Sequence, residues 1–148
     1  MKISIVMVFL LIIATTAFSA APGDISGLWI SAGGDSWLEL FPCGDKICGK
    51  IVWLKVPRYI DSNDGPIGKT KVDRKNPEPA LRNRPIIGLQ IIRGLTAKGA
   101  NRWENGSCYN PESGKRYSCS MKLVSPARLE LRGYIGISLI GRTFSLTR

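Results

Sequence analysis

Residues 116–134 read RYSCSMKLVSPARLELRGY, and this stretch decides the fold class. Apolar and polar side chains alternate before the Ser125-Pro126 turn signal and alternate again after it. Because successive side chains of a strand point to opposite faces, the pattern predicts two strands with one face toward a core and one toward water. We therefore expect an antiparallel hairpin here.

Similar short runs, separated by Gly, Pro, Asn and Asp, continue along the chain. The eight expected strands are Ile25–Ser31, Ser36–Pro42, Cys48–Val56, Gly88–Leu95, Arg102–Tyr109, Arg116–Val124, Arg128–Tyr134 and Arg142–Thr147. Short turns join neighbouring strands into an antiparallel up-and-down meander. The expected fold is all-β, a small closed barrel of about eight strands, because closure removes free edges. An open two-sheet sandwich is the alternative.

The first 21 residues predict export. Lys2 is their single charge, an apolar run follows from Ile3 to Ala14, and small residues end the segment. This order is typical of a cleavable signal peptide. The run is shorter than the roughly 20 apolar residues that span a membrane. We expect cleavage after Ser19 or Ala21, a single domain over residues 22–148, and no transmembrane segment after cleavage.

Charge narrows the class of partner. The chain carries a net charge of +10, and residues 115–148 alone carry +6. In an exported protein a basic surface favours a small amphipathic or anionic ligand, or an envelope component, over nucleic acid. A solvated surface that keeps the protein soluble is the simpler explanation.

Four cysteines, all in the exported part, favour disulfides over metal binding. Three pairings are open, and we favour the local ones, Cys43–Cys48 across a Gly44-Asp45 turn and Cys108–Cys119. The second pair lies directly opposite if its loop centres on Ser113-Gly114, and diagonally if the register shifts. Zinc is disfavoured, because the chain has no His and neither pair has C-x-x-C spacing. We expect no metal and no cofactor.

The expected first strand opens with Gly27-Leu28-Trp29, which resembles the start of lipocalin-type barrels. The resemblance implies that Trp29 closes one barrel end beneath an Arg of the last strand, in a cation–π contact. Arg148 shares the parity of Phe144 and Leu146 and should point inward. It is the first choice of partner, with Arg142 as the second.

The whole exported part also resembles a bacterial family known as domain of unknown function 2147. The resemblance rests on Gly27-Leu28-Trp29, Cys48–Leu54, Asp73 through Asn76-Pro77 to Leu81-Arg82, Arg84–Gly88, Trp103–Gly106, Tyr109–Lys115 with Tyr117, and Leu131–Tyr134. It implies an exported bacterial protein, in the periplasm, and it brings no activity with it. Leu146 stands where the family pattern leads us to expect an aromatic residue.

The long connection from Pro57 to Pro85 holds the main candidate site. Loops of this length are usually functional or disordered, so it is either a lid over one barrel end or a mobile surface loop. The candidate ligand-binding residues are Asp73, Asn76, Arg82 and Arg84. Two arginines can fork onto a carboxylate or a phosphate. The structural alternative is that Asp73 pairs with Arg82 and holds the loop down.

Aromatic residues give a second set of ligand candidates. They are Trp37, Trp53, Trp103, Tyr109 and Tyr117. Such residues can line a cavity inside a barrel, and more often they form its core.

Three function classes remain open, of which a non-enzymatic ligand-binding barrel is favoured. A protein-interaction or envelope-stress factor, including an inhibitor of a secreted enzyme, is the alternative. An enzyme of unknown class is third, because the chain lacks His and no two acids stand out as a catalytic pair. No catalytic residue is assigned.

Overall fold

A computed structural model describes residues 23–137 and 139–148 of the chain. The predicted signal peptide lies outside these residues. The strands of the described part are β1 (Gly27–Ser31), β2 (Ser36–Cys43), β3 (Lys46–Leu54), β4 (Gln90–Ala97), β5 (Arg102–Asn110), β6 (Lys115–Ser125), β7 (Arg128–Tyr134) and β8 (Gly141–Thr147). All eight predicted strands are confirmed, with ends that differ by no more than two residues.

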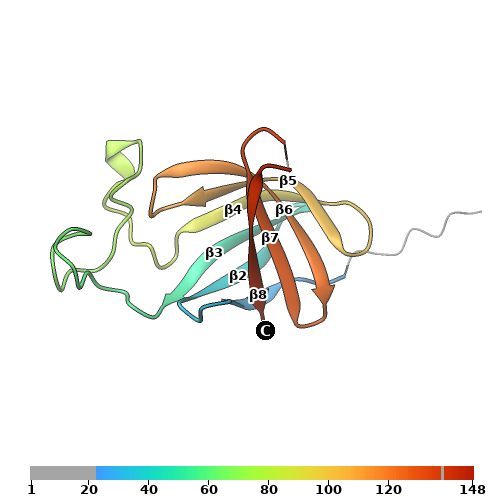
Figure 1. The fold of residues 1–148 in the computed structure, drawn as a ribbon, viewed down its shortest axis with the longest axis horizontal. Helices are drawn as coiled ribbons and strands as arrows, with labels where there is room; N and C mark the ends of the chain where they lie inside the picture. The colour runs from blue at the N-terminus through green and yellow to red at the C-terminus, as the bar shows by residue number, and fades with distance from the viewer. Residues whose placement is uncertain (1–22, 138) are drawn as a thin grey trace, which may run out of the picture.

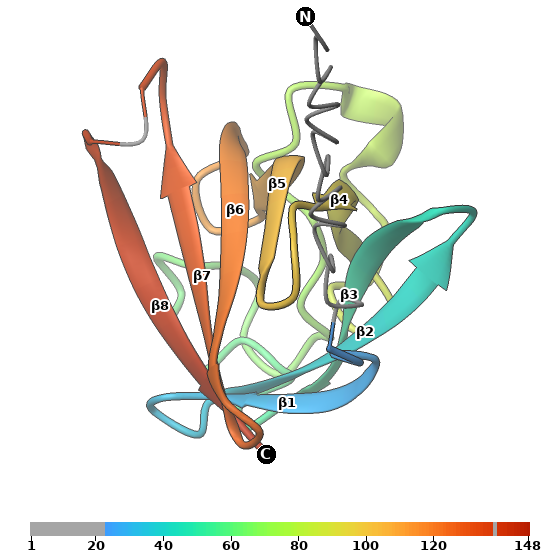
Figure 2. The same cartoon turned by 90° about the vertical axis from the view of Figure 1, so that its right-hand side faces the viewer.

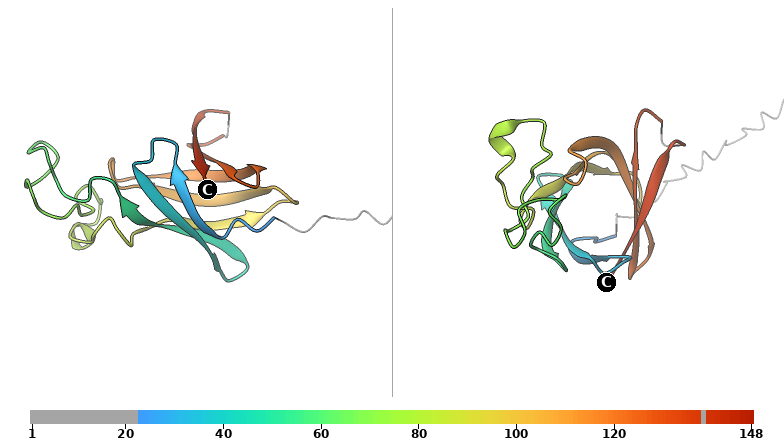
Figure 3. Two further views of the ribbon diagram at one scale, coloured as in Figure 1. Left: turned by 90° about the horizontal axis from the view of Figure 1, so that it is seen from below. Right: turned by 60° about the vertical axis from the view of Figure 1, so that its left-hand side comes forward.

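The strands follow one another around a closed barrel in chain order, and β8 returns to pair with β1. Every neighbouring pair is antiparallel, so the predicted up-and-down barrel is confirmed. Figure 2 shows β1 crossing the base of the barrel while β6, β7 and β8 rise beside one another. The closed ring is seen in the right view of Figure 3. Closure gives each strand edge a partner along part of its length.

Alternate side chains fill the barrel interior. Leu38 and Leu40 of β2 face Ile51 and Gly49 of β3 across the ladder. The main core cluster consists of Ile25, Trp29, Leu38, Leu40, Ile92, Leu95, Trp103, Cys119, Met121, Leu129 and Leu146. Because each large apolar side chain removed from water contributes about 1.5–3 kcal/mol, this cluster is the main source of the barrel's stability.

Trp29 closes one end of the barrel. Its side chain is fully buried, and its indole N–H donates to the carbonyl of Ile25 at 2.8 Å. The Arg148 guanidinium lies 4.4 Å from the Trp29 ring centroid and donates to backbone carbonyls of the N-terminal segment and the β6–β7 turn. Gly27, at a φ of 107°, lets the chain bend from this end into β1. Arg148 is exposed and lies over the barrel end, not inside it as its parity predicted.

The long connection, residues 55–89, joins β3 to β4 and extends past one end of the strands (Figure 1). It contains a short 3₁₀ helix, Pro79–Leu81, and two isolated β-bridges fold it back on itself. A second apolar cluster packs it on the barrel through Ile51, Ile86, Leu89 and Tyr109. In the right view of Figure 3 the connection lies beside the ring of strands and not across it. It is therefore a folded segment packed on the outside of the barrel and not a lid.

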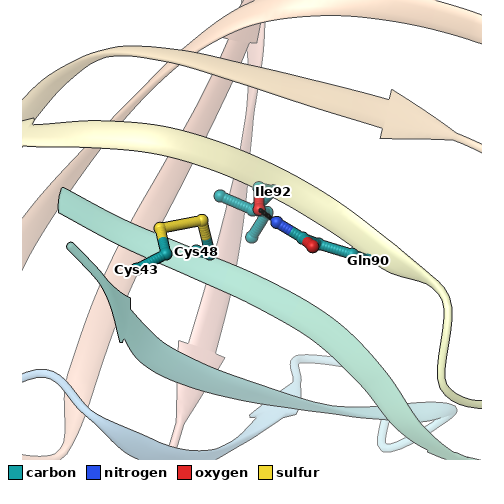
Figure 4. Close-up of a disulfide and its surroundings, with 4 residues drawn as sticks. All are labelled: Cys43, Cys48, Gln90 and Ile92. Atoms are coloured by element: carbon teal, nitrogen blue, oxygen red, sulfur yellow. Dashed lines mark hydrogen bonds between the residues drawn. A yellow bond between two sulfur atoms is a disulfide. The ribbon is translucent and has the colours of Figure 1, made fainter.

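Cys43 and Cys48 form a disulfide across the β2–β3 hairpin, with their Cα atoms 5.8 Å apart (Figure 4). The hairpin turns at Gly44, whose φ of 68° is in the left-handed region that glycine favours. The first predicted disulfide is therefore confirmed. It lies beside Gln90 and Ile92 of β4, where it ties the tip of the hairpin together next to the neighbouring strand.

The second predicted disulfide is wrong, because Cys108 and Cys119 are free thiols. Across the β5–β6 ladder Cys108 pairs with Tyr117, and Cys119 pairs with Gly106. The loop centres one residue earlier than Ser113-Gly114, which sets the cysteines diagonally in the barrel interior. A hydrogen bond to Cys119, together with burial, raises the pKa of Cys108 far above the usual range of a thiol.

Candidate functional site

The polar segment of the long connection forms a buried hydrogen-bond network around Asp73. The Asp73 side chain is 0% exposed. Its Oδ1 accepts from the Tyr109 hydroxyl at 2.5 Å, and its Oδ2 accepts from Asn76 Nδ2 at 2.7 Å and Arg84 Nη2 at 3.0 Å. A buried carboxylate requires such donors, because an unpaired charge in the interior is costly. The expected Asp73–Arg82 pair is wrong, since Arg84 takes that place.

Asn76 and Arg82 hold the following turn of the connection. Asn76 is 2% exposed, and its Oδ1 accepts from the backbone N–H of Glu78 at 2.9 Å. Its carbonyl accepts from Arg82 Nε at 2.7 Å. The guanidinium groups of Arg82 and Arg84 therefore brace different parts of the loop. The four predicted residues are brought together, and their contacts with one another shape the connection.

Tyr109 attaches this network to the barrel. It lies in β5, is 4% exposed, and has the Arg116 guanidinium 5.1 Å from its ring centroid. Burial, together with the hydrogen bond to Asp73, raises the pKa of Tyr109 to about 12. The phenol is therefore protonated at neutral pH and donates its hydrogen bond to Asp73.

The network is also clamped by the β5–β6 hairpin. A Cβ built on Gly114 would lie 1.9 Å from the Lys75 carbonyl oxygen, so the two backbones are in direct contact. Gly114 also has a φ of 71°. Glycine is needed here for both reasons, and the long connection is thereby fixed to the β5–β6 hairpin at a second point besides Tyr109.

The five aromatic candidates do not form one binding site. Trp37 and Trp53 lie against each other with ring centroids 5.1 Å apart, and both are partly exposed at the barrel surface. Trp103 is buried in the main core, whereas Tyr109 belongs to the Asp73 network. Tyr117 is half-buried opposite Cys108.

Two depressions on the described surface are partly open to solvent. One of about 310 Å³ lies at the closed end, against Ile25, Pro42 and Trp103. Another of about 120 Å³ lies between Arg102, Lys122 and their neighbours across β5 to β8.

The β7–β8 ladder contains a feature that the sequence reasoning missed. Across the β7–β8 ladder Leu129 faces Leu146 and Leu131 faces Phe144. The first pair is buried, at 0% and 3% exposure, whereas Phe144 is 55% exposed on the same face of β8. The face of the hairpin that lines the core is thus buried at one residue pair and exposed to solvent at the next pair on the same face.

Gly133 and Arg142 form the next pair on this face. A Cβ built on Gly133 would meet one described atom within 4 Å, the Cβ of Tyr117 at 3.8 Å. Arg142 is exposed above Phe144. We call the surface made by Tyr117, Leu131, Gly133, Arg142 and Phe144 the open inner face. It combines apolar side chains, room for a side chain at Gly133 and one cation.

The described residues hold no group of three or more His, Cys, Asp or Glu side chains arranged to bind a metal ion. No helix in this part of the chain has the length and apolarity needed to cross a bilayer.

Residues 27–148 match the model of a family described as an uncharacterized protein conserved in bacteria, DUF2147. The chain belongs to the DUF2147 family. The match spans every strand of the barrel, so the family corresponds to the entire folded domain. No curated protein matches the DUF2147 chain.

A solved structure shares the fold. The Helicobacter pylori protein HP1028, described as belonging to the lipocalin family, is 26% identical to the DUF2147 chain, with a TM-score of 0.70. The similarity covers 84% of this chain and 82% of that chain. The DUF2147 chain is therefore a lipocalin-like barrel.

Proposed function

We propose that this DUF2147 protein is exported to the periplasm and there binds, without catalysis, a small amphipathic or anionic molecule on the open inner face. The observation that carries the proposal is the change along β7–β8 from the buried Leu129–Leu146 pair to the exposed Phe144. An apolar surface left open inside a barrel wall can bind the hydrocarbon part of a ligand.

Arg142 supplies the polar half of this recognition. It lies two ladder pairs beyond Phe144, at the next position on the same face, and is exposed to solvent. A guanidinium next to an apolar surface favours a molecule whose hydrocarbon part ends in a carboxylate or a phosphate. The buried Asp73 network is separate and supports the fold.

Binding of a fluorescent fatty acid, a dansyl-labelled undecanoate, tests the proposal. Replacing Gly133 by Leu fills the free space, and we expect it to weaken binding by about tenfold or more, because the ligand loses its apolar contact. Replacing Arg142 by Gln should weaken binding of the anionic acid while leaving its neutral methyl ester unaffected.

Thr147→Leu is the control, since it also introduces a leucine into the β7–β8 hairpin, but on the opposite, outer face. Equal binding by wild type and the Gly133→Leu variant, with both folded by circular dichroism, would rule out the open inner face as the site. Equal losses in the Gly133→Leu and Thr147→Leu variants would lead to the same conclusion.

A further inference from the structure

The β7–β8 connection presents aliphatic side chains directly to water. Ile135, Ile137, Leu139 and Ile140 have exposed fractions of 59–85%. We call these four residues the aliphatic tip. Figure 2 shows the connection at the far end of β7 and β8, projecting beyond the neighbouring strands.

The turn itself does not require such residues. The connections β1–β2, β2–β3 and β4–β5 of the same barrel use Gly, Asp, Asn and other turn-forming residues, as at Gly33-Gly34-Asp35 and Gly44-Asp45. Four exposed aliphatic side chains in one short loop make an apolar patch, which in a soluble protein marks a contact surface. They also make no contribution to the core cluster.

The positive charge beside the aliphatic tip favours an anionic partner. Residues 115–148 contain seven Lys or Arg side chains and one acidic side chain, Glu130, although Arg128 and Arg148 lie at the opposite end of the β7–β8 hairpin from the tip. Arg132 of β7 donates to the Leu139 carbonyl at 3.3 Å, and Arg142 follows the tip at the start of β8. A second copy of this basic hairpin would be repelled, whereas an anionic surface would be attracted.

We propose that the aliphatic tip inserts into the surface of an anionic phospholipid bilayer. Ile135, Ile137, Leu139 and Ile140 enter the boundary between headgroups and acyl chains, and Arg132 and Arg142, the basic side chains that flank the tip, attract the lipid phosphates. The tip adjoins the open inner face, so docking would bring that face close to the lipid. The docking step does not depend on whether the open inner face binds a ligand.

Flotation with vesicles tests the docking. We expect the protein to float with vesicles that contain phosphatidylglycerol and phosphatidylcholine, and to float much less with phosphatidylcholine alone. The double variant Leu139→Ser/Ile140→Ser should bind the anionic vesicles about tenfold more weakly, because two aliphatic groups no longer leave water.

The matched control is Ile60→Ser/Ile67→Ser, which removes two similarly exposed aliphatic groups, at 74% and 66% exposure, from the long connection. It should float like wild type. Unchanged flotation of the tip variant, or equal losses in both variants, would overturn the proposal. So would tip-dependent dimerisation in sedimentation experiments without vesicle binding. A Gly133→Leu variant that floats normally but does not bind the fatty acid would separate docking from ligand binding.

Discussion

The hydroxyl of Tyr109 connects two parts of the chain that are 36 residues apart, the barrel wall and the carboxylate of Asp73. The bond is buried at both ends, because Asp73 is 0% and Tyr109 is 4% exposed. A buried hydrogen bond to a charged group stabilises a fold more than a neutral one does, and loss of the Tyr109 hydroxyl leaves Asp73 Oδ1 without its donor. This single contact therefore contributes to attachment of the whole long connection.

Stability at alkaline pH should report on this contact. The pKa of Tyr109 is raised to about 12 in the folded protein, whereas a free tyrosine ionises near 10. The native state then holds a proton that the unfolded chain releases, so the contribution is complete below about pH 10 and is lost as the pH rises toward 12. The unfolding free energy of the wild type should therefore fall between pH 9 and pH 12, as measured by urea unfolding. In Tyr109→Phe this fall should be smaller by about 1–2 kcal/mol.

The same variant should lose about 1–3 kcal/mol at pH 7, because Asp73 loses a donor. Tyr134→Phe is the control, since Tyr134 has no hydrogen bond through its hydroxyl among the described contacts. If Tyr109→Phe declined between pH 10 and pH 12 as steeply as wild type, the raised pKa would not be linked to folding.

Single residues also mark the limit of prediction from sequence. The partner of Asp73 is Arg84 and not Arg82, because the path of the loop decides between two arginines that are nearly equivalent in sequence. The geometry of Cys108 and Cys119 depends on which residue centres their hairpin loop. The partner of Asp73 and the register of the β5–β6 hairpin both depend on small local energy differences, which the alternation of apolar and polar residues does not reveal.

Among the elements, the contact between the long connection and the β5–β6 hairpin can be measured directly. Gly114→Ala places a methyl group against the Lys75 carbonyl and also strains the backbone at a φ of 71°. Gly99 has a φ of 88°, and a Cβ added there would meet no described atom within 4 Å, so Gly99→Ala adds backbone strain alone.

We expect Gly99→Ala to cost about 1 kcal/mol and Gly114→Ala about 2–4 kcal/mol of unfolding free energy, as measured by urea denaturation. Limited proteolysis should cut the long connection faster in the Gly114 variant. Equal losses in the two variants would mean that the hairpin does not hold the connection.

The strands were predictable because alternation is local. Residues 116–134 specify which side chains face the core without reference to any other part of the chain. The long connection is different: its burial depends on Ile51 of β3 and Tyr109 of β5, which lie far from it in sequence. Composition and length identified it as unusual, but its docked conformation depends on those distant contacts.

For the whole molecule, the β1–β8 seam is the shortest part of the barrel closure. β1 pairs with β8 at two positions, Ile30 with Thr147 and Ser31 with Leu146, whereas β7 pairs with β8 along seven. The upper part of β8 therefore continues past the end of β1, which is why Phe144 is exposed. The sequence predicted closure and the Trp29 end, but uneven closure depends on how far the strands are staggered around the ring.

We expect Arg148 to stabilise the short pairing between β1 and β8. Its guanidinium covers Trp29 and donates to carbonyls on both sides of the seam, so Arg148→Ala removes a cation–π contact and several hydrogen bonds together. Segments with few partners open most readily, and we expect amide hydrogen exchange in β1 and β8 to become about tenfold faster while β5 and β6 stay protected. Arg142→Ala, with the same charge change at the other end of β8, should leave exchange near wild type. Faster exchange throughout the barrel would mean that Arg148 supports global stability and not the seam. No change in exchange would mean that the two residue pairs between β1 and β8, with the buried Leu146, are enough to close the barrel.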